Sequence, residues 1–207
     1  MTLKRRLRDK LRKAFDQPSA AFGLLLALLK GHCYRLSLPL LGHRFKVGKN
    51  FRVFGRLRVV GAGSVVFGDS VTIGMTVTPF THSPDAQIQV GSRVYLNGTR
   101  FGCSSSISIG DDCILAECRI MDTNFHSVFR ERHSPDAPIA VRPVSIGRNV
   151  WVCADVALLP GTTIGENSVI SIGSVCRGIV AADSIFAGNP AVRIGAVPSI
   201  EDQNEES

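Results

Sequence analysis

A six-residue rhythm runs through most of this chain, and it is the period of neither an α-helix nor a simple alternating strand. In its clearest stretch an aliphatic residue or a cysteine stands at every sixth position, at Ile146, Val152, Leu158, Ile164, Ile170 and Cys176. Four positions after each of them stands a small or β-branched residue, at Val150, Val156, Thr162, Ser168, Ser174 and Val180. This rhythm predicts a parallel β-helix, in which three short strands make one triangular coil of about eighteen residues.

In such a solenoid each coil buries its inward face only against the next coil. The aliphatic column points into the prism, and the small residue fits beside a tight corner, where Gly147 and Gly165 suit the backbone. The same register is present earlier in the chain, over 47–58, 67–78, 90–101 and 109–120. We therefore predict an all-β solenoid.

Two segments interrupt the rhythm. The shorter covers 79–86 and the longer, a loop insert, covers 122–143. Inserts in a solenoid protrude as loops from one side of a rigid scaffold, and such loops commonly carry function. The longer insert is therefore the first place to look for catalytic side chains.

The front of the chain differs from the rest. Leu3, Leu7, Leu11 and Phe15 would share one helical face, and an apolar run of about ten residues then ends at Lys30. That run is too short to span a bilayer. We expect a basic, amphipathic helical extension over 1–46, a β-helix domain over 47–195 and an acidic tail over 196–207. The extension would pack on the domain or a neighbouring subunit, or residues 1–30 would lie on an anionic membrane surface.

Charge is divided unevenly along the chain. Residues 1–60 hold 15 Lys and Arg but two acids, whereas residues 61–207 hold nine Arg, no Lys and 15 acids. The main domain is therefore not expected to bind nucleic acid. The six cysteines form no CxxC pair, which favours buried thiols in a reducing compartment and no metal site. We predict a cytoplasmic protein, for which peripheral attachment to the inner face of the cell membrane stays open.

Three motifs make the chain recognisable: MDTNFHS in the insert, then PVSIGRNVWVCADVALLPGTTIGENSVISIGSV, and finally FAGNPAVRIG. With them the chain resembles the hexapeptide-repeat acetyltransferases, above all the galactoside and maltose O-acetyltransferases and the acetyltransferases of polysaccharide gene clusters. The resemblance covers about 47–195 and is specific over 88–192. It implies a left-handed parallel β-helix, a homotrimer with active sites between subunits, and acetyl-CoA as the donor.

The resemblance also implies roles for individual residues. His126 matches the position of the general base, and Asn97 matches a residue that helps hold the acceptor sugar. Ala154, Ile172 and Arg177 match positions along the track of the CoA pantetheine and nucleotide. No metal is expected.

The chemistry of acetyl transfer suits these residues. A neutral imidazole removes a proton from a hydroxyl at neutral pH, which fits His126. Its second ring nitrogen needs an acceptor, for which Asp122 and Glu131 of the same insert are candidates. Backbone N–H groups or Asn97 would stabilise the oxyanion. Arg193 is a candidate phosphate contact on CoA.

Other notable residues have plainer readings. His82 and His133 are expected to be ordinary loop surface. Trp151, at a corner of a repeat, would pack between subunits or line the CoA groove. Cys153 and Cys176 fall inside the repeat and are expected in the core, not as nucleophiles.

The predicted function is transfer of acetyl from acetyl-CoA to a sugar hydroxyl, with a sugar or lipid-linked saccharide as acceptor, in exopolysaccharide, capsule or O-antigen production. Three alternatives stay open. The first is N-acetylation of an amino sugar. The second is a γ-carbonic-anhydrase-like enzyme with zinc on His82, His126 and His133. The third is a non-catalytic β-helix subunit.

Overall fold

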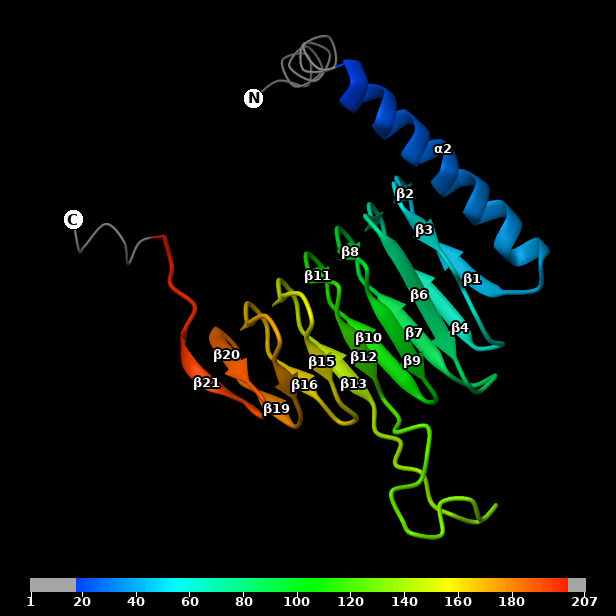
Figure 1. The fold of residues 1–207 in the computed structure, drawn as a ribbon. Coiled ribbons are helices and arrows are strands. Elements are labelled where there is room, and N and C mark those ends of the chain that lie inside the picture. Colours follow the sequence, from blue (N-terminus) through cyan, green and yellow to red (C-terminus); the bar gives the residue numbers. More distant parts are fainter. Residues whose placement is uncertain (1–17, 201–207) are drawn as a thin grey trace.

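The computed structural model describes residues 18–200, which form a parallel β-solenoid with one helix at its N-terminal end (Figure 1). Successive coils pair in register, so that Ile146 lies beside Ile164 and Leu158 beside Cys176. Both pairs are one eighteen-residue coil apart, as the rhythm predicted. The amphipathic face expected over residues 3–15, and residues 201–207 of the acidic tail, lie outside the described residues.

Three sheets form the sides of the prism. The first contains β1 (Arg44–Val47), β4 (Ser64–Phe67), β7 (Gln87–Val90), β10 (Ser106–Ile109), β13 (Val144–Ile146), β16 (Thr163–Ile164) and β19 (Ile179–Val180). The second contains β2 (Arg52–Val53), β5 (Thr72–Ile73), β8 (Tyr95–Asn97), β11 (Ile114–Ala116), β14 (Trp151–Val152), β17 (Val169–Ile170), β20 (Ser184–Gly188) and the antiparallel β21 (Ala191–Ala196). The third contains β3 (Arg56–Leu57), β6 (Thr76–Thr81), β9 (Arg100–Cys103), β12 (Arg119–Met121), β15 (Ala157–Leu158) and β18 (Val175–Cys176).

Both predicted columns face the interior of the prism. Every aliphatic position from Ile146 to Cys176, and every small position from Val150 to Val180, is at most 4% exposed. The small polar residues are satisfied there by the main chain: the hydroxyl of Thr162 donates to the Cys176 carbonyl at 3.0 Å, and that of Ser168 to Ala181 at 2.7 Å. Buried hydroxyl groups need such partners.

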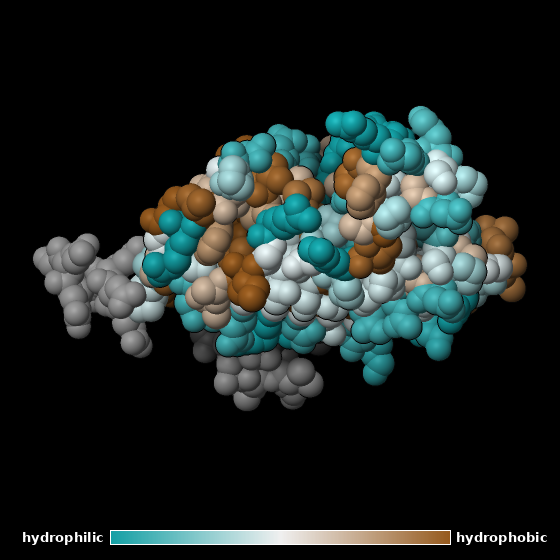
Figure 2. Space-filling model, turned by 90° about the horizontal axis from the view of Figure 1, so that it is seen from below, coloured by the Kyte–Doolittle hydropathy of each residue, from teal (hydrophilic) through white to brown (hydrophobic). Residues whose placement is uncertain are grey.

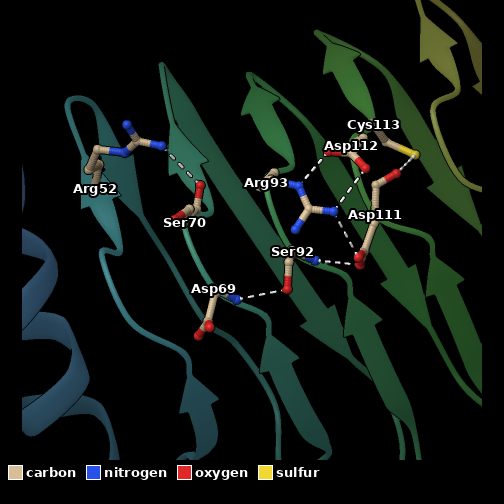
Figure 3. Close-up of polar contacts among 8 residues, drawn as sticks. All are labelled: Arg52, Asp69, Ser70, Ser92, Arg93, Asp111, Asp112 and Cys113. Carbon is tan, nitrogen blue, oxygen red and sulfur yellow. Dashed lines mark hydrogen bonds and ion pairs between the residues drawn. The ribbon is translucent and has the colours of Figure 1, made fainter. Parts of the chain in front are cut away.

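The corner between the first and second sheets is held by polar side chains of successive coils. Asn149 and Asn167 both adopt a left-handed backbone conformation, with φ of 56° and 57°, which asparagine tolerates. The Asn149 amide donates to the Asn167 side chain at 3.0 Å. In earlier coils Arg93 bridges Asp111 and Asp112 (Figure 3), at 3.1 and 2.6 Å.

Helix α2 (Pro18–Leu40) covers the N-terminal end of the solenoid (Figure 1). Ala27 and Leu38 are buried against the first coil. A Cβ on Gly31 would overlap the carbonyl of Phe51, so only glycine allows this close approach. Among residues 18–200, no helix has the length and hydropathy needed to cross a membrane.

The structure moves the expected ends of the solenoid and shortens one of the two expected interruptions. The first strand begins at Arg44 and the last ends at Ala196. The interruption expected over 79–86 is shorter than expected, because residues 79–81 are the end of β6 and only residues 82–86 form a loop. Pro79 has no N–H to donate, but its carbonyl accepts a hydrogen bond from the Val60 N–H at 2.9 Å, so a proline is compatible with the strand here. The longer insert, 122–143, leaves the solenoid between β12 and β13 and protrudes from it (Figure 1).

Candidate active site

The two ends of the insert are held together where it leaves the solenoid. The Arg142 N–H donates to the Asp122 carbonyl at 2.7 Å, which joins the two ends of the insert. The Asp122 side chain is fully buried and accepts from the N–H groups of Ser104 and Ser105, each at 2.7 Å. Its carboxylate therefore holds the neighbouring coil. Among the described residues this carboxylate forms no hydrogen bond with His126, so the structure gives no support to the candidate role of Asp122 in orienting that imidazole.

Aromatic stacking fixes the residue immediately before His126. The Phe125 backbone has a left-handed φ of 60°, and its ring packs on His82 with centroids 4.2 Å apart and the two planes tilted by 46°. His82 in turn stacks on Phe80 at 4.0 Å. Gly102 leaves the space that the Phe125 ring occupies. The start of the insert is thus pressed onto the third sheet.

His82 lies exposed outside the strands, as the sequence suggested, and its ring packs against Phe80 and Phe125. Burial lowers the pKa of its imidazole, and the nearby Asp122 carboxylate partly opposes this by raising the pKa. The neutral imidazole is thereby favoured inside the stack. No sequence signal pointed to this contact, because Phe125 follows β12 and therefore comes from a later coil than Phe80 and His82.

His126 stands between two cavities that also share Met121 and Asn124 as wall residues. The larger, about 540 Å³, reaches Arg132 and Leu159. The imidazole is exposed, and it has no hydrogen-bond partner among residues 18–200. Both ring nitrogens are therefore accessible to a ligand.

The smaller cavity, about 450 Å³, lies over the third sheet. Its wall includes the stacked rings of Phe80, His82 and Phe125, and the side chains of Arg100 and Arg119. It thus combines apolar ring faces with positive charge beside His126. On the side from which the insert protrudes, apolar residues form separate patches among hydrophilic ones (Figure 2).

The predicted site residues fall on two different corners of the third sheet. Asn97, at the end of β8, and Ala154 and Ile172, each just before a third-sheet strand, lie at the corner where the chain enters this sheet. His126 and Arg177 follow third-sheet strands, at the corner where the chain leaves it. A single chain therefore brings Ala154 and Ile172 together, and their coils are joined by the hydrogen bond from the Gly173 N–H to the Ala154 carbonyl at 3.0 Å. It leaves Asn97 and His126 at different corners.

Asn97 keeps a free donor at its corner. Its side-chain oxygen accepts from the Met75 N–H at 2.9 Å, while its NH₂ group has no partner within the described part of the chain. Arg193 lies exposed in β21, at the C-terminal end of the solenoid. Trp151 lies in β14, not at a corner, and is 49% exposed on the outer face of the second sheet.

The remaining candidate residues do not assemble a metal or thiol centre. Glu131 and His133 are exposed in the insert, and no group of three His, Cys, Asp or Glu within residues 18–200 is placed to hold a metal ion. Burial raises the pKa of Cys113 and Cys176 to about 11, which keeps these thiols protonated. Neither lines the cavities beside His126.

Sequence comparison finds relatives of the type that the motifs suggested. The chain is 30% identical over 113 residues to the galactoside O-acetyltransferase of Escherichia coli (strain K12), which is 54% of this chain and 55% of that protein. It is 34% identical over 94 residues to WbbJ of the same strain, whose name assigns it to lipopolysaccharide biosynthesis as an O-acetyl transferase; this covers 42% of this chain and 48% of WbbJ. The chain thus spans about half the length of the curated relatives it matches. No family-wide sequence model matches it.

Solved structures share the fold over most of the chain. AntD, an N-acyltransferase from Bacillus cereus crystallised with dTDP and 3-hydroxybutyryl-CoA, superposes with a TM-score of 0.65 and 18% identity, covering 82% of this chain and 93% of AntD. The hexapeptide-repeat-containing acetyltransferase VCA0836 from Vibrio cholerae gives 0.52 and 22% identity, covering 88% and 91%. The predicted left-handed parallel β-helix is confirmed. The resemblance to the hexapeptide-repeat acetyltransferases is confirmed too, in sequence over about half of the chain and in fold over most of it.

Proposed function

We propose that this protein transfers an acetyl group from acetyl-CoA to a sugar hydroxyl, with His126 as the general base. One observation carries the proposal: His126 is an exposed imidazole without a partner in the described chain, held between two cavities at the root of the insert. The similarity to O-acetyltransferases supports the same chemistry.

The residues can divide the reaction between them. A nitrogen of His126 takes the proton of the hydroxyl while its oxygen attacks the thioester carbonyl carbon. The Asn97 NH₂ group donates to the oxyanion that forms. The C–S bond then breaks, and the CoA sulfur leaves with the proton carried by His126. Binding both substrates in one groove supplies much of the remaining rate advantage.

The donor would bind along the corner that carries Ala154 and Ile172. Ile172 is 68% exposed, an apolar surface suited to the pantetheine chain. Arg177 and Arg193 are exposed cations for the phosphates of CoA. The acetyl carbonyl would then lie at the corner that carries Asn97.

A homotrimer would unite the two corners. The outer face of the second sheet carries Tyr95, Ile114 and Trp151 in register on adjacent strands, 39%, 47% and 49% exposed. A continuous apolar row of this kind favours association with another copy. This row borders the corner of Asn97, so a neighbouring subunit packed there would bring its own His126 toward that corner.

A lipid-linked saccharide is the acceptor best suited to the N-terminal end. Residues 18–68 hold eight Lys and Arg and no acid. On α2, Phe22, Leu25, Leu29 and Leu36 are between 53% and 62% exposed on the side away from the solenoid. Positive charge beside exposed apolar side chains favours an anionic membrane surface. We propose that residues 1–30, extended by the rest of α2, hold the enzyme there.

Calorimetric titration of acetyl-CoA into the full chain tests the donor without knowledge of the acceptor. Micromolar binding that persists in His126→Ala is expected, because His126 acts on the acceptor. A panel of sugars and amino sugars then separates hydroxyl from amine acceptors. Absence of acetyl-CoA binding would overturn the proposal, and turnover of amino sugars alone would change it to N-acetylation.

A further inference from the structure

Two arginines stand side by side on the third sheet next to His126. Arg100 is the first residue of β9 and Arg119 the first of β12, and the two are paired in register on adjacent parallel strands. Both side chains are exposed on the outer face. Neighbouring strands lie about 4.8 Å apart, so the two cationic side chains leave the sheet from closely spaced positions.

Neither arginine has a counter-ion in the described part of the chain. Arg93 and Arg148 each form an ion pair with an acid, whereas Arg100 and Arg119 form none within residues 18–200. Glu117 and Asp155 share a cavity wall with both arginines, but neither acid forms an ion pair with them. Like charges directly opposite each other on adjacent strands are destabilising. An anion bound between them would remove that repulsion.

The pair faces the same cavity as the proposed base. The 450 Å³ cavity is lined by Arg100, Arg119 and His126 together, with Phe80 and Phe125 on its wall. Aromatic faces suit the apolar side of a sugar ring, and guanidinium groups suit oxyanions, often through paired hydrogen bonds. The cavity therefore offers distinct places for a sugar ring, an anion and a reacting hydroxyl.

We propose that the acceptor is a phosphate-bearing sugar, whose phosphate binds Arg100 and Arg119 while one of its hydroxyls reaches His126. Two guanidinium groups balance the nearly two negative charges of a phosphate monoester at pH 7, whereas a carboxylate carries one. The inference rests on the proposed acetyl transfer and adds the acceptor class. It assigns the arginine pair to the acceptor, not to the phosphates of CoA.

Inorganic pyrophosphate serves as a probe of the arginine pair. It is titrated calorimetrically into the full chain saturated with acetyl-CoA, into Arg100→Gln/Arg119→Gln, and into Arg148→Gln. Arg148 is an exposed arginine of the same solenoid, paired with Glu166 and remote from both cavities beside His126. We expect pyrophosphate to bind the wild type and Arg148→Gln with similar affinity, and to bind the double variant at least tenfold more weakly. The affinity for acetyl-CoA should be the same in all three proteins.

Two results would overturn the inference while leaving acetyl transfer intact. One is equal or absent pyrophosphate binding in the wild type and the double variant. The other is pyrophosphate binding that occurs in the absence of acetyl-CoA and is lost when the chain is saturated with it, which would assign the arginines to the donor. Failure of acetyl-CoA itself to bind would instead overturn the proposed function, so the two failures are distinguishable.

Turnover gives a second readout. Hexose 1-phosphates are compared with the matching methyl glycosides as acceptors. We expect the double variant to raise KM at least tenfold for the phosphates and to leave that for the neutral glycosides unchanged. An equal rise in KM for both classes of acceptor would mean that the arginines support the shape of the cavity but do not bind the phosphate, and would contradict the proposal.

Discussion

The ring of Phe125 occupies the place where a side chain on Gly102 would be. A Cβ on Gly102 would overlap ring atom Cζ and lie 3.0 Å from Cε2. The insert and the third sheet are therefore fitted to each other at one point, immediately before His126. That contact also sets the stack of Phe125 on His82.

Gly102→Ala is expected to displace the Phe125 ring and misplace His126. The added methyl group should cost about 1–3 kcal/mol of unfolding free energy, as overpacking does, and should lower the transfer rate while acetyl-CoA still binds. Denaturant unfolding and turnover measure the two effects. Gly195→Ala is the matched control, because its Cβ would meet no atom within 4 Å. Equal loss in both variants would contradict the packing argument.

His126→Gln is expected to lower kcat about 10²- to 10⁴-fold, the usual contribution of general base catalysis, because glutamine cannot take the hydroxyl proton. Steady-state kinetics with acetyl-CoA measure kcat, and calorimetry checks that donor affinity is retained. His133→Gln, an exposed histidine of the same insert, serves as control. A similar kcat for the two variants would exclude His126 as the base.

Acid should weaken the aromatic stack. Because burial lowers the pKa of folded His82 below the ordinary 6.5, the unfolded chain takes up this proton first as the pH falls. The stabilising contribution is fully present above about pH 6.5 and is lost as the pH falls through the lower folded value. His82→Phe keeps the stack without the titration. Its thermal midpoint should fall less between pH 7.5 and pH 5 than that of the wild type, and an equal fall would contradict the assignment.

The exposed side of α2 should bind anionic membranes. Full-length protein is expected to sediment with phosphatidylglycerol vesicles, less at high salt, and to sediment weakly with phosphatidylcholine vesicles. Leu25→Asp/Leu36→Asp should abolish sedimentation. Ile179→Asp, at an 83% exposed residue of β19, controls for added charge elsewhere. Unchanged sedimentation of the α2 variant would show that this helix face does not meet the lipid.

The coil could be derived from the sequence because its determinants are local. The apolar character of each sixth residue from Ile146 to Cys176 indicates that this residue is buried, and every coil packs on the one beside it. A six-residue period is therefore enough to specify the prism. His126 was likewise found from its place in a motif on an interrupting segment. The segment 79–86 was predicted as an interruption because the rhythm stops there, but its first three residues still pair with the neighbouring strand β9, and pairing of the main chain does not require the six-residue period.

The contents of the site depend on which coils lie beside each other, and this the tertiary structure decides. Arg100 meets Arg119, and His82 meets Phe125, because segments of unequal length return each coil to the same register. No repeat period specifies those lengths. The sequence by itself determined the prism and the loop that carries His126. Only the stacked coils decided which side chains share its cavity, because contacts between coils depend on register and not on distance along the chain.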